Sequence, residues 1–181
     1  MDYKQTISYL FPSAIYATDY TLYFAFGSSV PEIKNWDATK LGTQPTVETL
    51  QQAWDSVLVQ QARIVQIALI AAASTAAQTT GFSSSALGSE YTYPSGIQDQ
   101  ANLNAVATSS TFPIQPSGAT FLFWCTSASG VSGFVAHTAA QIQKVGMDGL
   151  AAIMAQKSKQ WALTQQIQAA TTVAEVQAIV W

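Results

Sequence analysis

The sequence has few charged residues. Seven of its 181 residues are Lys or Arg and ten are Asp or Glu, so charged residues make up 9% of the chain, against roughly 25% in typical soluble proteins. The basic residues form no cluster larger than Lys157 and Lys159, so we expect no nucleic acid partner. A surface this poor in charge repels its own copies weakly, which favours a protein that neighbouring subunits cover in an assembly.

Cysteine and histidine occur once each. A single cysteine, Cys125, rules out an internal disulfide, and its place in the apolar run "ATFLFWCT" predicts a small buried side chain in a strand. A single histidine, His137, cannot form a metal site with two imidazole ligands, and we expect no metal and no cofactor. We interpret His137 as a helix-capping or surface residue.

Catalytic motifs are also missing. The sequence contains no G-x-S-x-G, no H-E-x-x-H and no glycine-rich phosphate loop. Ser132, His137 and Asp148 could form a Ser–His–Asp set, but such sets arise by chance in a serine-rich chain. The sequence therefore predicts a protein that is not an enzyme.

Acidic and aromatic residues gather near the N-terminus. Glu32 and Asp37 flank Trp36, but spacing along the chain does not give the separation of two carboxylates that glycoside hydrolysis needs. A receptor- or glycan-binding tip is a less favoured hypothesis, and aromatic residues of a core explain the pattern equally well. The aromatic residues on which it rests are Tyr16, Tyr20, Tyr23 and Trp36.

Long uninterrupted hydrophobic runs are absent. The N-terminal "MDYKQTISYLFPSAIY" has an acid at position 2 and no apolar run of the length of a signal peptide. Residues 64–89 carry no charge, but Gln, Ser and Thr interrupt them. A spanning helix needs about 20 predominantly apolar residues, so we expect no membrane span.

What the sequence contains falls into two parts. Residues 1–45 are aromatic and broken by Gly and Pro, which predicts short strands and loops and no long helix. Residues 46–181 predict two long helices, an antiparallel β-hairpin unit between them and a short C-terminal helix. The expected fold class is α+β, with coiled-coil-like helix packing as a variant.

The first long helix is predicted for residues 47–77. Pro45 disfavours helical geometry at Gln44, and Thr46 suits the N-cap. Apolar residues then alternate at spacings of three and four, as in a coiled-coil seam, and a partner from the same chain or from another subunit fits this spacing. The following "IVQIALIAAA" is apolar nearly all round, which indicates burial or an interface. The seam comprises Val47, Leu50, Trp54, Val57, Gln61, Ile64, Ala68 and Ala71.

The later part of the chain predicts a hairpin and a second long helix. "ATFLFWCTSASGVSGFVAHT" predicts two strands joined at "SASG", and "SEYTYPSG" predicts a short strand before a helix start near Ser95 or Asp99. The second long helix is predicted for residues 138–169, where Gly146 and Gly149 indicate a kink or close backbone packing. Its predicted apolar face comprises Ile142, Val145, Leu150, Ile153, Trp161 and Ile167.

The chain ends on "TTVAEVQAIVW", an apolar terminus. Thr172 and Glu175 match the S/T-x-x-E capping box that starts a helix. A helix this short is marginal alone, so we expect it to fold back on the core, with Trp181 buried as the final anchor. Its apolar face is predicted to comprise Val173, Val176, Ile179 and Val180.

Three segments occur in a distinctive order: "YTYPSGIQDQANLNAV", "FLFWCTSASGVSGFVAHTAAQIQKV" and "QQIQAATTVAEVQAIVW". They resemble the DUF4376 family, a domain of unknown function widespread in bacteriophage tail proteins, whose members end on a closely similar tail. Upstream, "IKNWDATKLGTQPTVETL" is similar to the leader before this domain in phage proteins of the tail-fibre and tail-fibre-assembly type. The resemblance covers residues 33–181 and implies a phage protein, with residues 46–181 as the DUF4376-like domain and no catalytic residue.

From this resemblance we expect a structural protein of the phage tail or tail-fibre apparatus, present in the virion and, during assembly, in the host cytoplasm. Its expected partners are other tail or fibre proteins and further copies of the chain. A tail-fibre assembly chaperone is the first alternative. The candidate structural and interface residues are Leu50, Trp54, Val57, Gln61, Ile64, Thr172, Glu175, Val176, Ile179 and Trp181.

Overall fold

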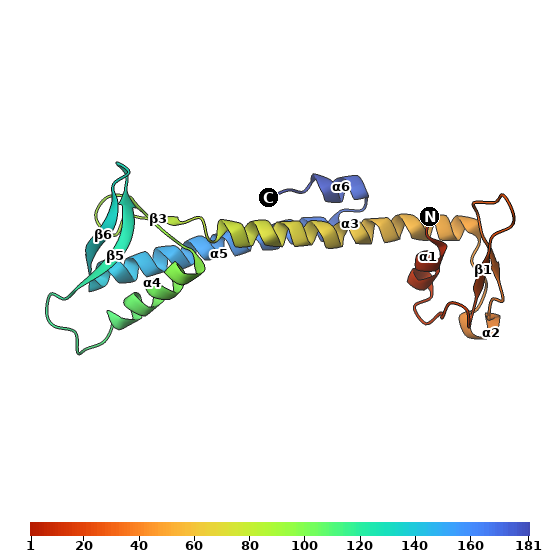
Figure 1. Cartoon of the computed structure of the whole chain (residues 1–181), viewed down its shortest axis with the longest axis horizontal. Helices are drawn as coiled ribbons and strands as arrows, with labels where there is room; N and C mark the ends of the chain where they lie inside the picture. Colours follow the sequence, from red (N-terminus) through yellow and green to blue (C-terminus); the bar gives the residue numbers. More distant parts are fainter. The chain divides into compact units, whose positions relative to one another are not determined.

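The computed structural model describes all 181 residues and shows an α+β chain (Figure 1). The chain forms two compact units. Residues 1–66 and 169–178 make up the N-terminal unit, and residues 67–168 and 179–181 make up the C-terminal unit. The division falls inside the long helix α3 (Val47–Ala77), whose bounds are those predicted.

The N-terminal unit begins with a helix that the sequence analysis missed. α1 (Tyr3–Leu10) is a short helix in a segment predicted to hold only strands and loops. It begins at Asp2, whose carboxylate accepts a hydrogen bond from the Gln5 backbone N–H at 2.9 Å. A helix of this length needs tertiary contacts, and the fully buried side chain of Ile7 provides them.

Short strands and a helical turn follow α1. β1 (Thr21–Tyr23) and β2 (Glu32–Lys34) pair antiparallel. The Asp37 carboxylate starts α2 (Ala38–Leu41) by accepting hydrogen bonds from two backbone N–H groups of its first turn. The last helix of the unit is α6 (Val173–Ala178). The apolar cluster of the unit has the buried residues Ile7, Tyr20 and Leu50 at its centre.

An ion pair between a buried acid, Asp19, and an exposed base, Lys40, supports this unit. Asp19 is almost fully buried, and its Oδ2 lies 2.6 Å from the Lys40 ammonium and accepts a hydrogen bond from the Ile15 N–H at 2.8 Å. These two hydrogen bonds lower the pKa of Asp19 from its ordinary value. The carboxylate therefore stabilises the folded state in its charged form.

The C-terminal unit contains a four-stranded antiparallel sheet with the strand order β3-β4-β5-β6. Its strands are β3 (Phe82–Ser84), β4 (Tyr91–Tyr93), β5 (Thr120–Ser127) and β6 (Ser132–Thr138). β5 and β6 form the predicted hairpin, which turns at the predicted "SASG", where Gly130 has a φ of +84° that favours glycine. β3 was not predicted from the sequence.

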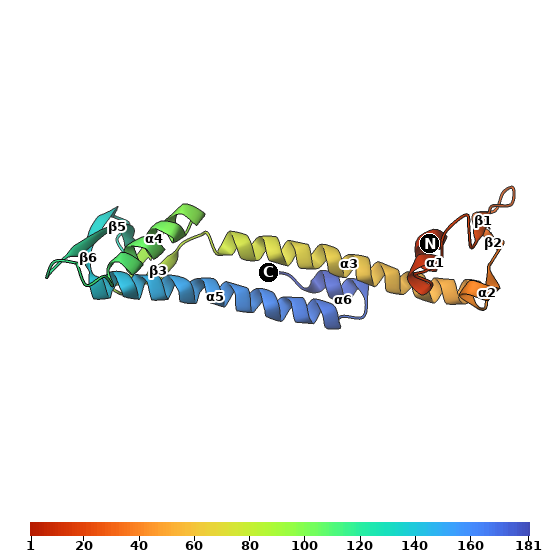
Figure 2. The same ribbon diagram turned by 90° about the horizontal axis from the view of Figure 1, so that it is seen from below.

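One face of this sheet packs on helices. Phe123 and Cys125 alternate along β5 with exposed neighbours and point into the core, as predicted for Cys125. The helices are α4 (Ile97–Ser109) and α5 (Ala139–Ala169), and both Figure 1 and Figure 2 show α4 running beside α5. The buried core comprises Phe82, Tyr93, Leu103, Phe123, Cys125, Ile142 and Val145.

Two glycines let neighbouring segments approach α5 closely. A Cβ atom at Gly149 would lie 2.9 Å from the Phe82 Cζ, and one at Gly146 would lie 3.3 Å from the Ala107 Cβ on α4. Phe82 is itself buried and stacks on Tyr93 with ring centroids 5.6 Å apart. Of the two explanations that the sequence left open for these glycines, close packing is therefore the one that the structure supports.

We expect Gly149→Ala to lower the melting temperature, although alanine favours a helix interior by about 1 kcal/mol over glycine. The added methyl group overpacks the Phe82 ring, which typically costs about 1–3 kcal/mol. In the background of Phe82→Leu, which opens space there, the same change should no longer destabilise. A higher melting temperature for Gly149→Ala alone would contradict the close contact.

The Asp19 carboxylate predicts an acid-dependent stability. Its folded-state pKa is lowered, so its contribution is fully present above the unfolded-state pKa and is lost as the pH falls through the folded-state pKa. We expect Asp19→Asn to lower the urea midpoint at pH 7 and to flatten its fall at acidic pH, measured by circular dichroism. Asp55→Asn, at an exposed acid of α3, is the control and should change little.

Candidate functional site

The predicted seam along α3 is buried only in its first part. Leu50 and Val57 are buried and Trp54 is half-buried, whereas Ile64 is 71% exposed. Only the first part of the seam therefore packs within the chain, and the exposed positions leave open the predicted alternative of a partner from another subunit. The exposed seam positions are Val47, Gln61, Ile64 and Ala68.

A different face of α3 is buried in its second half. Gln66, Ile70 and Ser74 are buried there, at steps of four residues. Residues 64–77 are apolar or small on nearly every side, so their pattern did not distinguish the face that packs from the face that stays open. A heptad seam also drifts around a straight helix of 3.6 residues per turn.

The open face of α3 carries the α3 stripe, which we define as Ile64, Val65 and Leu69. All three side chains are more than half exposed. By length and composition α3 could cross a membrane, and only 17% of its most apolar window is buried. Length and composition alone do not distinguish such a helix from one that binds protein.

α5 also has an open apolar face. Ile142, Val145 and Ile167 are buried as predicted, but Leu150 and Trp161 are exposed, which corrects the predicted apolar face. The helix has apolar residues on two sides, and packing within the chain covers one of them. The open side, which we name the α5 stripe, comprises Met147, Leu150, Met154 and Trp161. Met147 and Met154 were missed, although their spacing from Leu150 could have indicated them.

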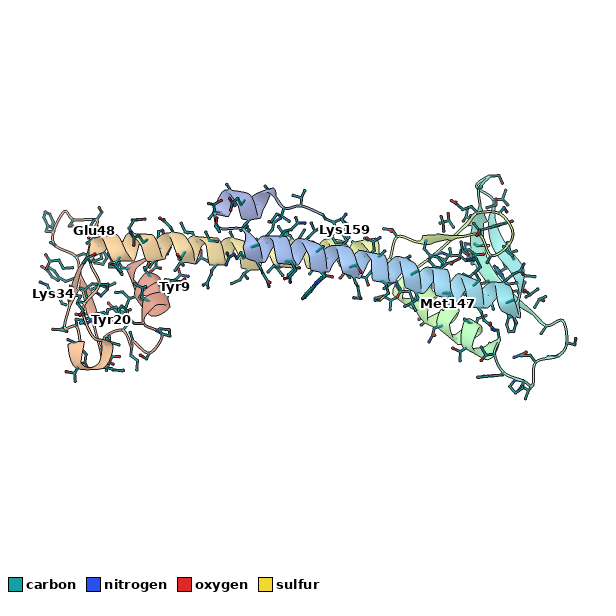
Figure 3. All side chains as sticks on the ribbon, turned by 180° about the vertical axis from the view of Figure 1, so that it is seen from behind. Tyr9, Tyr20, Lys34, Glu48, Met147 and Lys159 are labelled. Carbon is teal, nitrogen blue, oxygen red and sulfur yellow. The ribbon has the colours of Figure 1, made fainter.

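An uncharged groove lies between α4 and α5. It has a volume of about 570 Å³, and none of the side chains that line it is ionisable. Leu103 and Ala107 of α4 face Met147 and Leu150 of α5 across it. In Figure 3, Met147 lies on α5 beside α4. The groove is therefore suited to an apolar group.

The outer face of the hairpin is aromatic. Trp124 of β5 lies opposite Phe134 of β6, with ring centroids 5.3 Å apart in an edge-on arrangement, and Leu122 lies opposite Ala136. Leu122, Trp124 and Phe134 are exposed. We name these three residues the sheet face. They alternate with the buried side chains of the same strands.

The C-terminal capping box forms as predicted. The backbone N–H groups of Thr171 and Thr172 donate to the Glu175 carboxylate at 2.7 and 3.0 Å, and the Glu175 N–H donates to the Thr172 hydroxyl at 3.2 Å. The hydrogen bonds that Thr171 and Thr172 donate to this carboxylate hold the pKa of Glu175 below its ordinary value. Arg63 of α3 donates a hydrogen bond to the Ala170 carbonyl at 2.7 Å, which fixes the chain just before the helix.

The residues after the capping box differ in burial. Val176 is fully buried, Val173 and Ile179 are half-buried, and Val180 is 67% exposed. The apolar face predicted for this segment is thus wrong at Val180. α6 ends at Ala178, so the last residues do not continue the helical face.

Trp181 is half-buried rather than buried, which corrects its predicted role as a core anchor. The Lys159 ammonium of α5 lies 4.3 Å from the centroid of its ring, a cation–π contact (Figure 3 labels Lys159). Trp181 belongs to neither buried cluster of the chain. A half-covered indole contributes less to stability than a buried one.

His137 is buried in β6, which corrects its interpretation as a capping or surface residue. Its Nδ1 lies 2.8 Å from the Val135 carbonyl, which can only accept, so Nδ1 carries the proton. In the neutral ring Nε2 then accepts from the Tyr93 hydroxyl, 2.9 Å away. Burial raises the pKa of Tyr93 and that of nearby Cys125, so both stay protonated.

The three residues of the hypothetical Ser–His–Asp set have separate partners. The Ser132 hydroxyl pairs with that of Thr126 at 2.8 Å. Asp148 accepts from the Ser84 hydroxyl at 2.5 Å and pairs with Lys144 at 2.9 Å. Burial alone would raise the pKa of Asp148, but these two partners together lower it. The structure does not bring the set together.

The acids near Trp36 also have local partners. Glu32 pairs with Lys34 at 2.6 Å, and Asp37 caps α2. The indole N–H of Trp36 donates to the Gly42 carbonyl at 2.8 Å, and its ring is half-buried. Of the four aromatic residues in the glycan hypothesis, only Tyr16 and Tyr23 are exposed. No group of three His, Cys, Asp or Glu side chains could hold a metal ion.

Family models match both parts of the chain. Residues 59–180 match the domain of unknown function DUF4376. The chain belongs to the DUF4376 family. Residues 3–62 match the XkdW protein family, which is phage-associated, and together the two matches indicate a phage-related protein. No curated protein and no solved structure matches the chain.

The DUF4376 match includes all the open apolar surfaces described above. The α3 stripe, the groove, the α5 stripe and the sheet face lie within residues 59–180. The XkdW match instead covers α1 to the first part of α3. The resemblance of the sequence to DUF4376 is thus confirmed, whereas the match to the XkdW family was not predicted.

Val176 and Val180 provide a matched test of α6 in this DUF4376 protein. Val176→Asp places an unpaired carboxylate in a buried site and should cost several kcal/mol, whereas Val180→Asp at an exposed site should stay within about 0.5 kcal/mol. Thermal unfolding followed by circular dichroism measures both. Trp181→Ala should cost less than the about 3–5 kcal/mol typical of a buried tryptophan. Equal effects of the two valine changes would contradict the burial of α6.

Proposed function

We propose that this chain is a structural protein of the phage virion, built in several copies into the tail or tail-fibre apparatus. It acts by binding other virion proteins and further copies of itself. The observation that carries this proposal is the presence, in a phage-related chain, of three open apolar surfaces on regular secondary structure. Assembly takes place in the host cytoplasm, and the finished location is the virion.

The open surfaces support a role in assembly. Large contiguous apolar patches are rare on monomeric proteins and mark interaction sites. The α3 stripe, the α5 stripe and the sheet face together expose ten large apolar side chains, and the chain has only 17 charged residues to surround them. Burial against neighbouring subunits removes this surface from water and stabilises the assembly by roughly 25 cal/mol for each Å².

The polar groups support a role without catalysis. His137 is buried between Tyr93 and a backbone carbonyl, whereas Asp148 pairs with Ser84 and Ser132 pairs with Thr126. An activated nucleophile needs a base within hydrogen-bond reach. The low charge and the lack of a basic cluster likewise support protein partners over nucleic acid.

Mass spectrometry of purified virions tests the location. A structural component should be present at a fixed ratio to the other tail proteins after washing in high salt. A tail-fibre assembly chaperone should instead be found with fibre proteins in infected-cell extracts and be absent from virions. That second result would reject the virion role while leaving the phage relationship intact.

Substitutions at a buried and at an exposed residue of α3 distinguish an effect on folding from an effect on binding to other virion proteins. Val57→Asp should unfold the chain because Val57 is buried, whereas Ile64→Asp should leave the helical signal and melting temperature nearly unchanged and reduce incorporation into virions. Complementation of a phage lacking the gene, followed by immunoblotting of virions, measures this. Gln52→Glu, at an exposed site on the same helix, is the control. Normal incorporation of Ile64→Asp would argue against docking through the α3 stripe.

A further inference from the structure

The α5 stripe has the spacing of a coiled-coil seam. Met147, Leu150, Met154 and Trp161 follow one another at steps of three, four and seven residues, and Lys157 occupies the remaining seam position. The four apolar side chains are 53–68% exposed. A second heptad row on the opposite side of α5 packs within the chain, so this row has no partner there.

The two ends of the stripe differ, since one end borders the groove and the other carries a large aromatic side chain. At one end, Met147 and Leu150 form one wall of the uncharged groove against α4. At the other end, about 21 Å along the helix at 1.5 Å per residue, stands the exposed indole of Trp161. A large aromatic side chain and an apolar groove are the usual parts of a binding hot spot.

We infer that the α5 stripe is a self-association surface, through which two copies of this chain pair antiparallel about a two-fold axis near Met154. Each copy places its Trp161 against the groove of the other. The same patch then serves both subunits, as in an isologous dimer, the commonest form of oligomer. The inference rests on α5 itself and not on the proposed virion role.

Charge favours a second copy and sets the orientation. The groove and the four apolar stripe residues carry no charge, so two copies meet without an unpaired acid or base at the centre. In a parallel, in-register pair the two Lys157 ammoniums would face each other and repel. In an antiparallel pair they lie apart, each stem covers apolar surface of the other copy, and each ammonium reaches water.

The available area suits a dimer. The four stripe side chains expose on the order of 500 Å², at the upper end of the roughly 300–600 Å² of the largest patch on a typical monomer. The groove and the residues that flank the stripe are covered as well, which brings the contact towards the about 800 Å² per partner of a standard interface. A second copy thus covers the stripe without help from another protein.

Charge exchange at Met154 tests the inference on the purified full-length chain. The wild type should sediment as a dimer of its 19.3 kDa chain at micromolar concentration. Met154→Glu and Met154→Lys should each weaken self-association by about 100-fold, because like charges meet across the axis. An equimolar mixture of the two variants should restore dimers. Trp161→Ala, which keeps the charge unchanged, should also weaken the dimer.

Ala155→Glu is the matched control, since residue 155 is exposed on the same helix about 100° from the stripe. It should leave the dimer unchanged, and all variants should keep the wild-type circular dichroism. Three results would overturn the inference: a wild-type monomer at tens of micromolar, a wild-type monomer that instead binds phospholipid vesicles, or variants at Met154 that dimerise like the wild type. Failure of the mixture to restore dimers would also do so, whatever the virion experiments show.

Discussion

Each long helix of this protein has more apolar surface than its neighbours in the chain cover. α5 buries Ile142 and Ile167 on one side and leaves Met154 and Trp161 open on the other. α3 buries Ile70 and leaves its stripe open in the same way. Apolar surface in water is costly, and with 9% charged residues the chain has few charges to place over it. Each long helix therefore has one apolar face covered by the chain and one open apolar face. The open face must either stay in water, at a cost in free energy, or be covered by a partner.

The few ionisable groups serve mainly to fix local geometry. Asp2, Asp37 and Glu175 each start a helix by accepting backbone hydrogen bonds, which satisfies donors that a helix end leaves unpaired. Asp19 and Asp148 each join a lysine to a neighbouring group of the chain. These acids form hydrogen bonds and ion pairs within the chain and do not lie on the open surfaces. The open surfaces are therefore almost uncharged, and a partner would bind them through apolar contacts.

Local patterns gave much of the fold, and they failed where a side chain's surroundings come from distant residues. Helix 47–77, the hairpin turn at "SASG" and the capping box of Thr172 and Glu175 depend on spacing and turn chemistry within a few residues, and all three are present. The buried place of His137 depends on Tyr93, which lies 44 residues earlier in the chain. α1 was missed because a short helix is held by tertiary contacts rather than by its own propensity.

The sequence by itself determined the two long helices, the capping box of the C-terminal helix and the relation of the chain to phage proteins, because these properties reside in neighbouring residues or in whole-segment similarity. Only the tertiary structure decided which face of α3 and α5 is covered. Leu150 and Ile142 fit the same apolar spacing on α5, yet one is exposed and the other is buried. The reason is that either face of a helix with two apolar faces can pack. The neighbouring elements of the fold cover one of these faces and leave the other exposed.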